Sequence, residues 1–121
     1  TAARKVTAIY DEALSPIEVN IAQFSLLRRI AHKEPISLTD LAAVCELDRS
    51  TVGRNAKVLE RRKLVATVKA KDQREACLTL TAAGRNVLEV GAPLWAAVQA
   101  RLTAAIGPEA IASWQAVASE L

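Results

Sequence analysis

Apolar side chains recur every three or four residues along most of the chain, and proline or glycine marks the breaks between these stretches. This spacing is typical of amphipathic helices, because it gathers the apolar residues on one face. Ser15–Pro16 and Glu34–Pro35 end the first two stretches, since a residue before proline rarely stays helical. The pattern predicts helices over residues 2–14, about 20–32, 38–45, 49–63, 81–106 and 108–121.

Two other segments alternate between apolar and polar residues, as half-buried strands do. They are residues 64–70 and 76–80, and the polar, charged stretch 71–75 between them predicts a hairpin tip. Ile36–Ser37 is long enough for only a minimal strand. The sequence therefore predicts a mainly α fold with a small β-hairpin.

The helix expected to begin at Arg49 has a narrow apolar stripe. Only Val52, Ala56 and Leu59 are spaced to face a core, so most of this helix is expected to face outward.

Two polar residues mark the helix starts in this region. Ser37 is the expected N-cap of the short helix 38–45, with Asp40 three residues later in a weak capping box. A tight turn at 46–48 follows, and Asp48 is expected to cap the next helix.

Basic residues concentrate on the outward helix and the hairpin. Between Arg49 and Arg74 there are nine basic and two acidic residues, a net charge of +7. The rest of the chain has seven basic and eleven acidic residues, a net charge of −4. Such segregation is typical of a surface that meets phosphate, although charge alone would equally suit a solvated face.

The order of the predicted elements favours a phosphate-binding surface over a solvated charged face. A short helix, a tight turn, an exposed basic helix and a basic hairpin form the order of a winged helix-turn-helix. In that arrangement the second helix lies in the major groove of DNA, and the hairpin tip reaches the adjacent minor groove. The sequence therefore predicts a protein that binds double-stranded DNA.

Composition narrows the remaining possibilities. A chain of 121 residues and 13.0 kDa suits one domain, and 51% hydrophobic with 3% aromatic residues favours closely packed helices. No apolar run approaches the ~20 residues that span a bilayer. The first residues lack the apolar core of a signal peptide, and the missing initiator methionine suggests a truncated first helix. Two cysteines 32 positions apart, with no CxxC motif, suit a reducing cytoplasm.

The chain resembles the MarR family of bacterial transcriptional regulators. The similarity lies in residues 38–65, LTDLAAVCELDRSTVGRNAKVLERRKLV, and 71–84, KDQREACLTLTAAG, with support from 23–31, QFSLLRRIA. Five short motifs occur in the family order, including the Asp-x-Arg of the wing and Leu-Thr-x-x-Gly at the start of the long helix. Lys63 stands where the family usually has glycine.

The resemblance implies a single MarR-like domain over 1–121. Residues 20–80 would form the winged helix-turn-helix lobe, and 1–19 with 81–121 a helical dimerisation region. It further implies a homodimer on a near-palindromic operator, most simply as a repressor, with a phenolic or carboxylate effector. Leu102 and Trp114 lie on apolar stripes that a lone domain of this size is not expected to cover.

The candidate DNA-binding residues lie away from the buried stripe or at the hairpin tip. Thr51 and its neighbour Ser50 would hold phosphates or base edges, while Arg54 and Asn55 would meet purine edges. Resemblance assigns the minor-groove arginine to Arg74. The full set is Ser50, Thr51, Arg54, Asn55, Lys57, Lys71, Asp72 and Arg74, with Asp72 orienting Arg74 and Lys71 meeting phosphate.

Other chemistry is not indicated. Cys45 and Cys77 are expected in the core, and His32 lacks companions for a metal site. No cofactor, no metal and no catalytic set is predicted, so the protein is not expected to be an enzyme. Trp95 is a packing residue or, alternatively, part of an effector pocket. The rival interpretation is a winged helix that docks an acidic protein partner.

Overall fold

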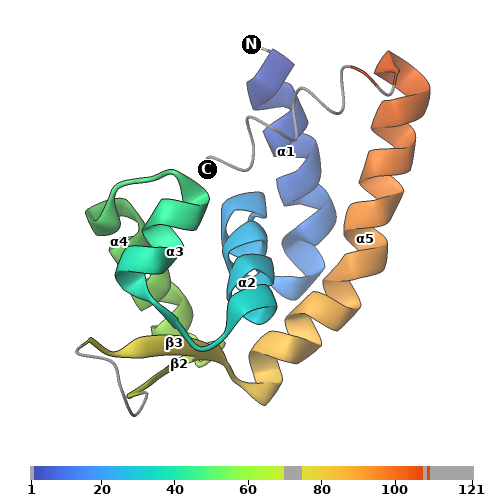
Figure 1. Cartoon of the computed structure of the whole chain (residues 1–121). Helices are drawn as coiled ribbons and strands as arrows, with labels where there is room; N and C mark the ends of the chain where they lie inside the picture. The colour runs from blue at the N-terminus through green and yellow to red at the C-terminus, as the bar shows by residue number, and fades with distance from the viewer. Residues whose placement is uncertain (1, 70–74, 108, 110–121) are drawn as a thin grey trace.

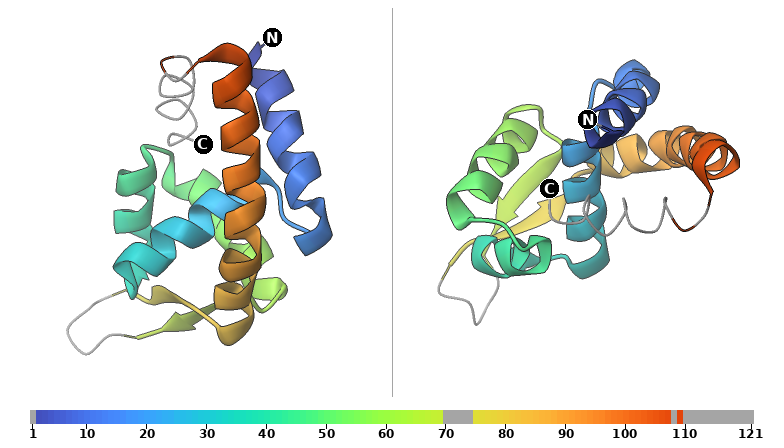
Figure 2. Two further views of the ribbon diagram at one scale, coloured as in Figure 1. Left: turned by 90° about the vertical axis from the view of Figure 1, so that its right-hand side faces the viewer. Right: turned by 90° about the horizontal axis from the view of Figure 1, so that it is seen from above.

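Three helices form one side of the molecule and a small helix-and-sheet unit forms the other (Figure 1). The computed structural model describes residues 2–69, 75–107 and 109. Helices α1 (Ala2–Leu14) and α5 (Ala82–Ile106) pack side by side, and α2 (Ile21–Lys33) connects them to the second unit (Figure 2). The second unit contains α3 (Leu38–Cys45), α4 (Arg49–Arg61), β1 (Ile36–Ser37), β2 (Val65–Val68) and β3 (Cys77–Leu80).

The mainly α fold with a β-hairpin is confirmed, and the first helix has the predicted bounds. A 3-10 turn, Ser15–Ile17, follows it. The expected last helix and hairpin-tip residues 70–74 lie outside the described residues.

The sheet has three antiparallel strands in the order β1–β3–β2. Val65 pairs with Leu80 at one end of the hairpin, and Val68 pairs with Cys77 at the other. Ile36 pairs with Leu78, so the minimal strand expected at 36–37 covers the free edge of β3. Since Val65 and Leu80 are buried and Val68 is 37% exposed, the hairpin is anchored at its inner end and projects at its outer end.

The core runs continuously from α1 to the sheet. Tyr10, Leu27, Leu41 and Leu59 are fully buried, each from a different helix. Leu102 is only 7% exposed and belongs to this core. The expectation that a single chain could not cover Leu102 is therefore wrong: the side-by-side packing of α5 on α1 buries it.

Helix starts are fixed by side-chain caps. Ser37 Oγ accepts a hydrogen bond from the Asp40 backbone N–H at 3.1 Å, as the sequence predicted. Asn20 and Gln23 form a full capping box at α2, with bonds of 2.8 and 3.0 Å. Asp48 occupies the N-cap position of α4 but makes no side-chain capping bond, so that expectation was wrong.

Helix α4 stops at Arg61, two residues before the predicted end. Lys63 adopts a left-handed conformation, φ 61°, and its N–H donates to the Glu60 carbonyl at 2.9 Å. The Leu64 N–H donates to the Leu59 carbonyl at 2.9 Å, which completes a Schellman motif. Position 63 therefore requires the conformation for which glycine is best suited.

Thr81 joins the end of α4 to the start of α5. Its hydroxyl donates to the Lys63 carbonyl at 2.7 Å and accepts from the Gly84 N–H at 3.0 Å. Its own N–H donates to the Leu64 carbonyl at 3.1 Å. A Cβ at Gly84 would collide with that carbonyl oxygen, so the Leu-Thr-x-x-Gly motif has a steric and a hydrogen-bonding cause.

Replacing Lys63 with glycine should stabilise the protein. A non-glycine residue in the left-handed region costs about 1 kcal/mol, and glycine removes that cost. Urea unfolding should show a higher midpoint for Lys63→Gly. The matched control is Lys57→Gly in the middle of α4, where the same change should destabilise by about 1 kcal/mol. A loss of stability at both positions would contradict this account of position 63.

Candidate nucleic-acid interface

One face of α4 is a continuous exposed stripe. Ser50, Arg54, Lys57 and Arg61 recur at steps of four, three and four residues, and all four are exposed. This spacing keeps them on one side of a helix with 3.6 residues per turn. The opposite side holds the predicted anchors Val52, Ala56 and Leu59, which are 1%, 5% and 0% exposed. The helix is thus held by one face and presents a polar, basic face to solvent.

Thr51 and Asn55 flank this stripe and are half-buried. The Arg54 guanidinium donates to Thr51 Oγ1 at 3.4 Å, so these two side chains are held together at the start of the helix. Arg62 also lies on the half-buried flank, whereas Arg61 continues the exposed stripe. These two neighbouring arginines therefore differ in their angular positions on the helix and in their access to a ligand.

The hairpin extends the basic surface beyond α4. Lys69 is exposed at the end of β2. The predicted tip residues Lys71, Asp72 and Arg74 lie outside the described residues. The strand pairing that ends at Val68 and Cys77 brings the two sides of this tip together.

A groove of about 260 Å³ lies between α4 and the hairpin. Arg49 and Lys57 line it together with Glu60 and Glu75. Glu60 accepts a hydrogen bond from the Thr67 hydroxyl, which ties α4 to β2. Arg49 Nη2 lies 3.1 Å from Glu75 Oε2, which ties α4 to the base of β3.

The Glu75 carboxylate is held by several donors. The Thr39 hydroxyl, followed by the Arg49 guanidinium and the Ser37 hydroxyl, hydrogen-bonds it and holds its pKa below the usual range, while partial burial opposes the shift. Sequence analysis missed this arrangement. Arg49 and Glu75 are 26 positions apart, and only the hairpin geometry brings them together.

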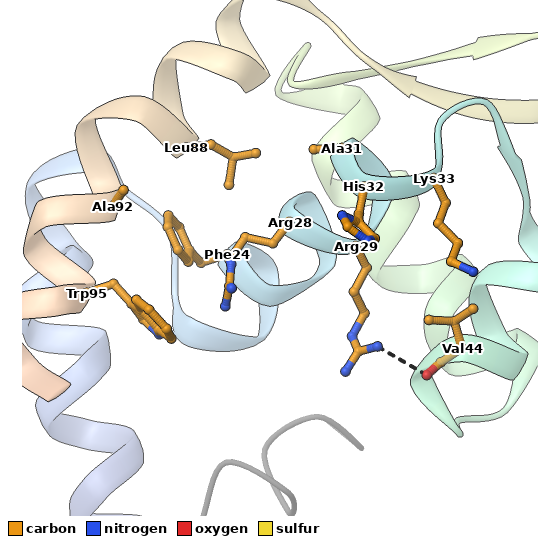
Figure 3. Close-up of a pocket in the computed structure, with 10 residues that line it drawn as sticks. All are labelled: Phe24, Arg28, Arg29, Ala31, His32, Lys33, Val44, Leu88, Ala92 and Trp95. Atoms are coloured by element: carbon orange, nitrogen blue, oxygen red, sulfur yellow. Dashed lines mark hydrogen bonds between the residues drawn. The ribbon is translucent and has the colours of Figure 1, made fainter. Parts of the chain in front are cut away.

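A second, larger cavity of about 640 Å³ lies between α2, α3 and α5 (Figure 3). Its floor is apolar, and one side carries cations from the last turns of α2. The Arg28 guanidinium lies over the Trp95 ring, 4.4 Å from its centroid, and Arg29 Nη1 donates to the Val44 carbonyl at 3.2 Å. Among the described residues, the lining has no acidic member and comprises Phe24, Arg28, Arg29, Ala31, His32, Lys33, Val44, Leu88, Ala92 and Trp95.

Both cysteines are buried in the free thiol form, as expected. Burial raises the pKa of Cys45, and the charge of nearby Arg29 opposes the shift only in part. Within the described residues no group of His, Cys, Asp or Glu could hold a metal ion. The helices of that part of the chain include none long and apolar enough to cross a membrane.

Comparison with known proteins matches this architecture. The MarR family profile matches residues 17–75. The transcriptional regulator MosR of M. tuberculosis, solved in complex with DNA, is 35% identical, with 97% of this chain and 87% of that chain covered and a TM-score of 0.83. The protein belongs to the MarR family. As a MarR-family member it is a DNA-binding transcription regulator with a winged helix-turn-helix, and its matched relatives are regulators rather than enzymes.

Two more distant MarR-family structures share the fold. A mutant form of E. coli MarR, complexed with operator DNA, is 22% identical, covers 94% of this chain and 83% of that chain, and has a TM-score of 0.81. S. aureus MarR in complex with salicylate and kanamycin is 22% identical. The match covers 84% of this chain and 68% of that chain, with a TM-score of 0.73. A comparison with curated protein sequences found no match.

Proposed function

We propose that the protein is a sequence-specific repressor that binds a near-palindromic operator as a homodimer in the bacterial cytoplasm. The observation that carries this proposal is the exposed stripe of α4, which lies opposite a fully buried face. A helix anchored in this way can enter the major groove without losing its packing. We therefore call α4 the recognition helix.

Within this proposal each candidate residue has a role set by its position. Arg54 and Asn55 contact purine edges, and Ser50, Thr51 and Lys57 contact phosphates or neighbouring base edges. The Thr51–Arg54 hydrogen bond supports a shared position for these two side chains. At the hairpin tip, Arg74 enters the minor groove, Asp72 orients it, and Lys71 meets phosphate.

A protein-interaction module with a basic docking face is the alternative. The mixture of hydroxyl, amide and guanidinium groups on α4 suits base edges and phosphates better than it suits a purely acidic surface. Binding to duplex DNA that weakens steeply with salt favours the DNA-binding function, because each phosphate contact adds a slope of about −0.9.

The proposed dimer uses residues 1–19 and 81–121, apart from the DNA-binding lobe of residues 20–80. Part of α5 supports this division, because an apolar stripe on it is exposed. Val90 is 45% exposed, and Ala97 and Ala104 continue the same line at steps of seven residues. A second copy across a two-fold axis would cover this stripe and set two recognition helices about one turn of DNA apart.

The proposed effector is a small aromatic carboxylate or phenol bound in the cavity between α2, α3 and α5. Trp95 and Phe24 offer apolar contact, and Arg28 and Lys33 offer charge to an anion. Salicylate in the complex of S. aureus MarR is a molecule of this class. The cavity therefore favours the second of the two roles that the sequence left open for Trp95.

Arg54→Ala should lower affinity for the operator by roughly tenfold to 100-fold, the range for a lost bidentate base contact. Fluorescence anisotropy with duplexes from the gene's upstream region and of random sequence measures this. Lys33→Ala, which removes an exposed cation from the end of α2, away from α4 and from the proposed dimer region, is the matched control and should change little. Equal losses on both duplexes would reduce Arg54 to a phosphate contact.

Ala97→Glu should weaken the dimer and with it operator binding. A carboxylate in an apolar interface loses its hydration, which pairing with Arg101 one turn later offsets only in part, whereas exposed Ala97 plays no part in the fold of one chain. Sedimentation velocity should show monomers, with an unchanged circular dichroism spectrum. Ala43→Glu, at an exposed alanine of α3, is the control and should stay dimeric. An intact Ala97→Glu dimer would place the interface elsewhere.

Salicylate should release the protein from its operator, and Arg28→Ala should raise the concentration required by roughly tenfold, because a charge-assisted hydrogen bond is lost. Operator release followed by anisotropy measures the response. Trp95→Ala should act in the same direction. If both cavity variants respond like the unchanged protein, the effector binds elsewhere.

A further inference from the structure

Glu75 occupies an unusual place for an acidic residue in a basic surface. It lies just before β3, at the outer end of the hairpin, beside Arg49 at the start of α4. Its Oε2 lies 3.1 Å from Nη2 of Arg49, the first residue of the recognition helix. The side chains of Arg49 and Glu75 are 61% and 36% exposed, so the pair forms on the surface of the groove and is open to competition from DNA.

The carboxylate is fixed more firmly than a single surface ion pair would be. The hydroxyls of Thr39 and Ser37 lie close enough to lower its pKa together with Arg49. Ser37 is itself fixed as the cap of α3, because its oxygen accepts from the Asp40 N–H at 3.1 Å. The lowered pKa of Glu75 shows that these neighbours favour its charged form. Arg49, the more exposed partner, is therefore the side that must move if the pair opens.

The groove that holds this pair lies on the expected path of a DNA strand. In a winged helix-turn-helix the helix lies in the major groove and the wing tip in the minor groove, so the phosphates between the two grooves pass between helix and hairpin. The groove here is lined by two cations, Arg49 and Lys57, and two carboxylates, Glu60 and Glu75, among the described residues. Arg49 is paired with one of these carboxylates at 3.1 Å.

We propose that Glu75 limits the affinity of the protein for DNA, because its carboxylate occupies the Arg49 guanidinium in the place of a phosphate. This inference rests on the proposed DNA-binding function. Arg49 stays with Glu75 in the complex, so it releases no counterion from DNA and adds nothing to the salt dependence. The recognition helix thus binds with one cation fewer than its sequence suggests.

The test is Glu75→Gln, which removes the charge and keeps an oxygen that can accept from Thr39 and Ser37. Affinity should rise about two- to fivefold per recognition helix at low salt, on operator and random duplexes alike, since an exposed pair is worth little. The gain at about 50 mM salt should exceed that at about 200 mM by about 3.5-fold for each phosphate contact added. Thermal unfolding of the variant should match that of the unchanged protein.

Two further variants make the assignment specific. Glu60→Gln removes the same charge from the same groove, but its described partner is the Thr67 hydroxyl, so it frees no arginine. It should produce a smaller gain and no steeper salt dependence. Arg49→Gln combined with Glu75→Gln should return affinity and salt slope to those of the unchanged protein.

The possible results of these measurements distinguish failure of the Glu75 inference from failure of the proposed DNA-binding function. Unchanged or weaker binding by Glu75→Gln overturns the inference, and weaker binding would make Glu75 a support for Arg49. If Glu60→Gln raises DNA affinity equally, or if the gain persists when Arg49 is also replaced, the effect comes from the net charge of the groove. Either result also overturns the inference. Failure of the unchanged protein to bind any duplex would instead count against the proposed function.

Discussion

The hydroxyl of Thr81 holds the end of the recognition helix against the start of the long helix. It donates to the Lys63 carbonyl and accepts from the Gly84 N–H, while the Thr81 N–H binds the Leu64 carbonyl. Four parts of the fold meet there: the end of α4, the start of β2, the end of β3 and the start of α5. The direction of α4 relative to α5 is set at this joint, since glycine at position 84 lets the backbones touch.

This joint gives the proposed effector a route to the DNA-binding lobe. The cavity lies between α5 on one side and α2 and α3 on the other. A ligand that changes the spacing of α5 and α2 acts on α5, whose first turn is bonded to the end of α4. Arg85 in that first turn also pairs with Glu34, which accepts from Thr79 in β3. Under the proposed regulation, a displacement of α5 therefore reaches the wing and the recognition helix together through these contacts.

Structural features that follow from the local spacing of apolar residues could be predicted from the sequence. Features that depend on where the backbone turns could not. The spacing of Val52, Ala56 and Leu59 identified both the helix and its buried face. The end of that helix was predicted two residues too late, because lysine at position 63 does not by itself indicate a left-handed backbone. Asp48 has the right chemistry and the extended backbone of a cap, yet its side chain makes no capping bond, and the sequence alone does not fix that side-chain orientation.

The candidate site shows the same division. The exposed face of α4 follows from helical spacing, so the positions of Ser50, Arg54 and Lys57 on it could be predicted. The contact between Arg49 and Glu75 could not, because it depends on the register of the hairpin and its angle to α4. The cavity beside Trp95 likewise depends on a distant contact, because α5 packs against the consecutive helices α2 and α3 from about fifty residues further along the chain.

The division of α4 into two faces has a consequence for how such regulators diverge. The residues that hold the helix in place and the residues that face outward are different residues, although they alternate along one short segment. Substitutions on the outer face leave the packing unchanged, so a duplicated gene can acquire a new operator while its product keeps folding. Substitutions on the inner face disturb the packing, because Val52 and Leu59 belong to the shared core. A family built on this helix can therefore retain one architecture while its DNA targets separate.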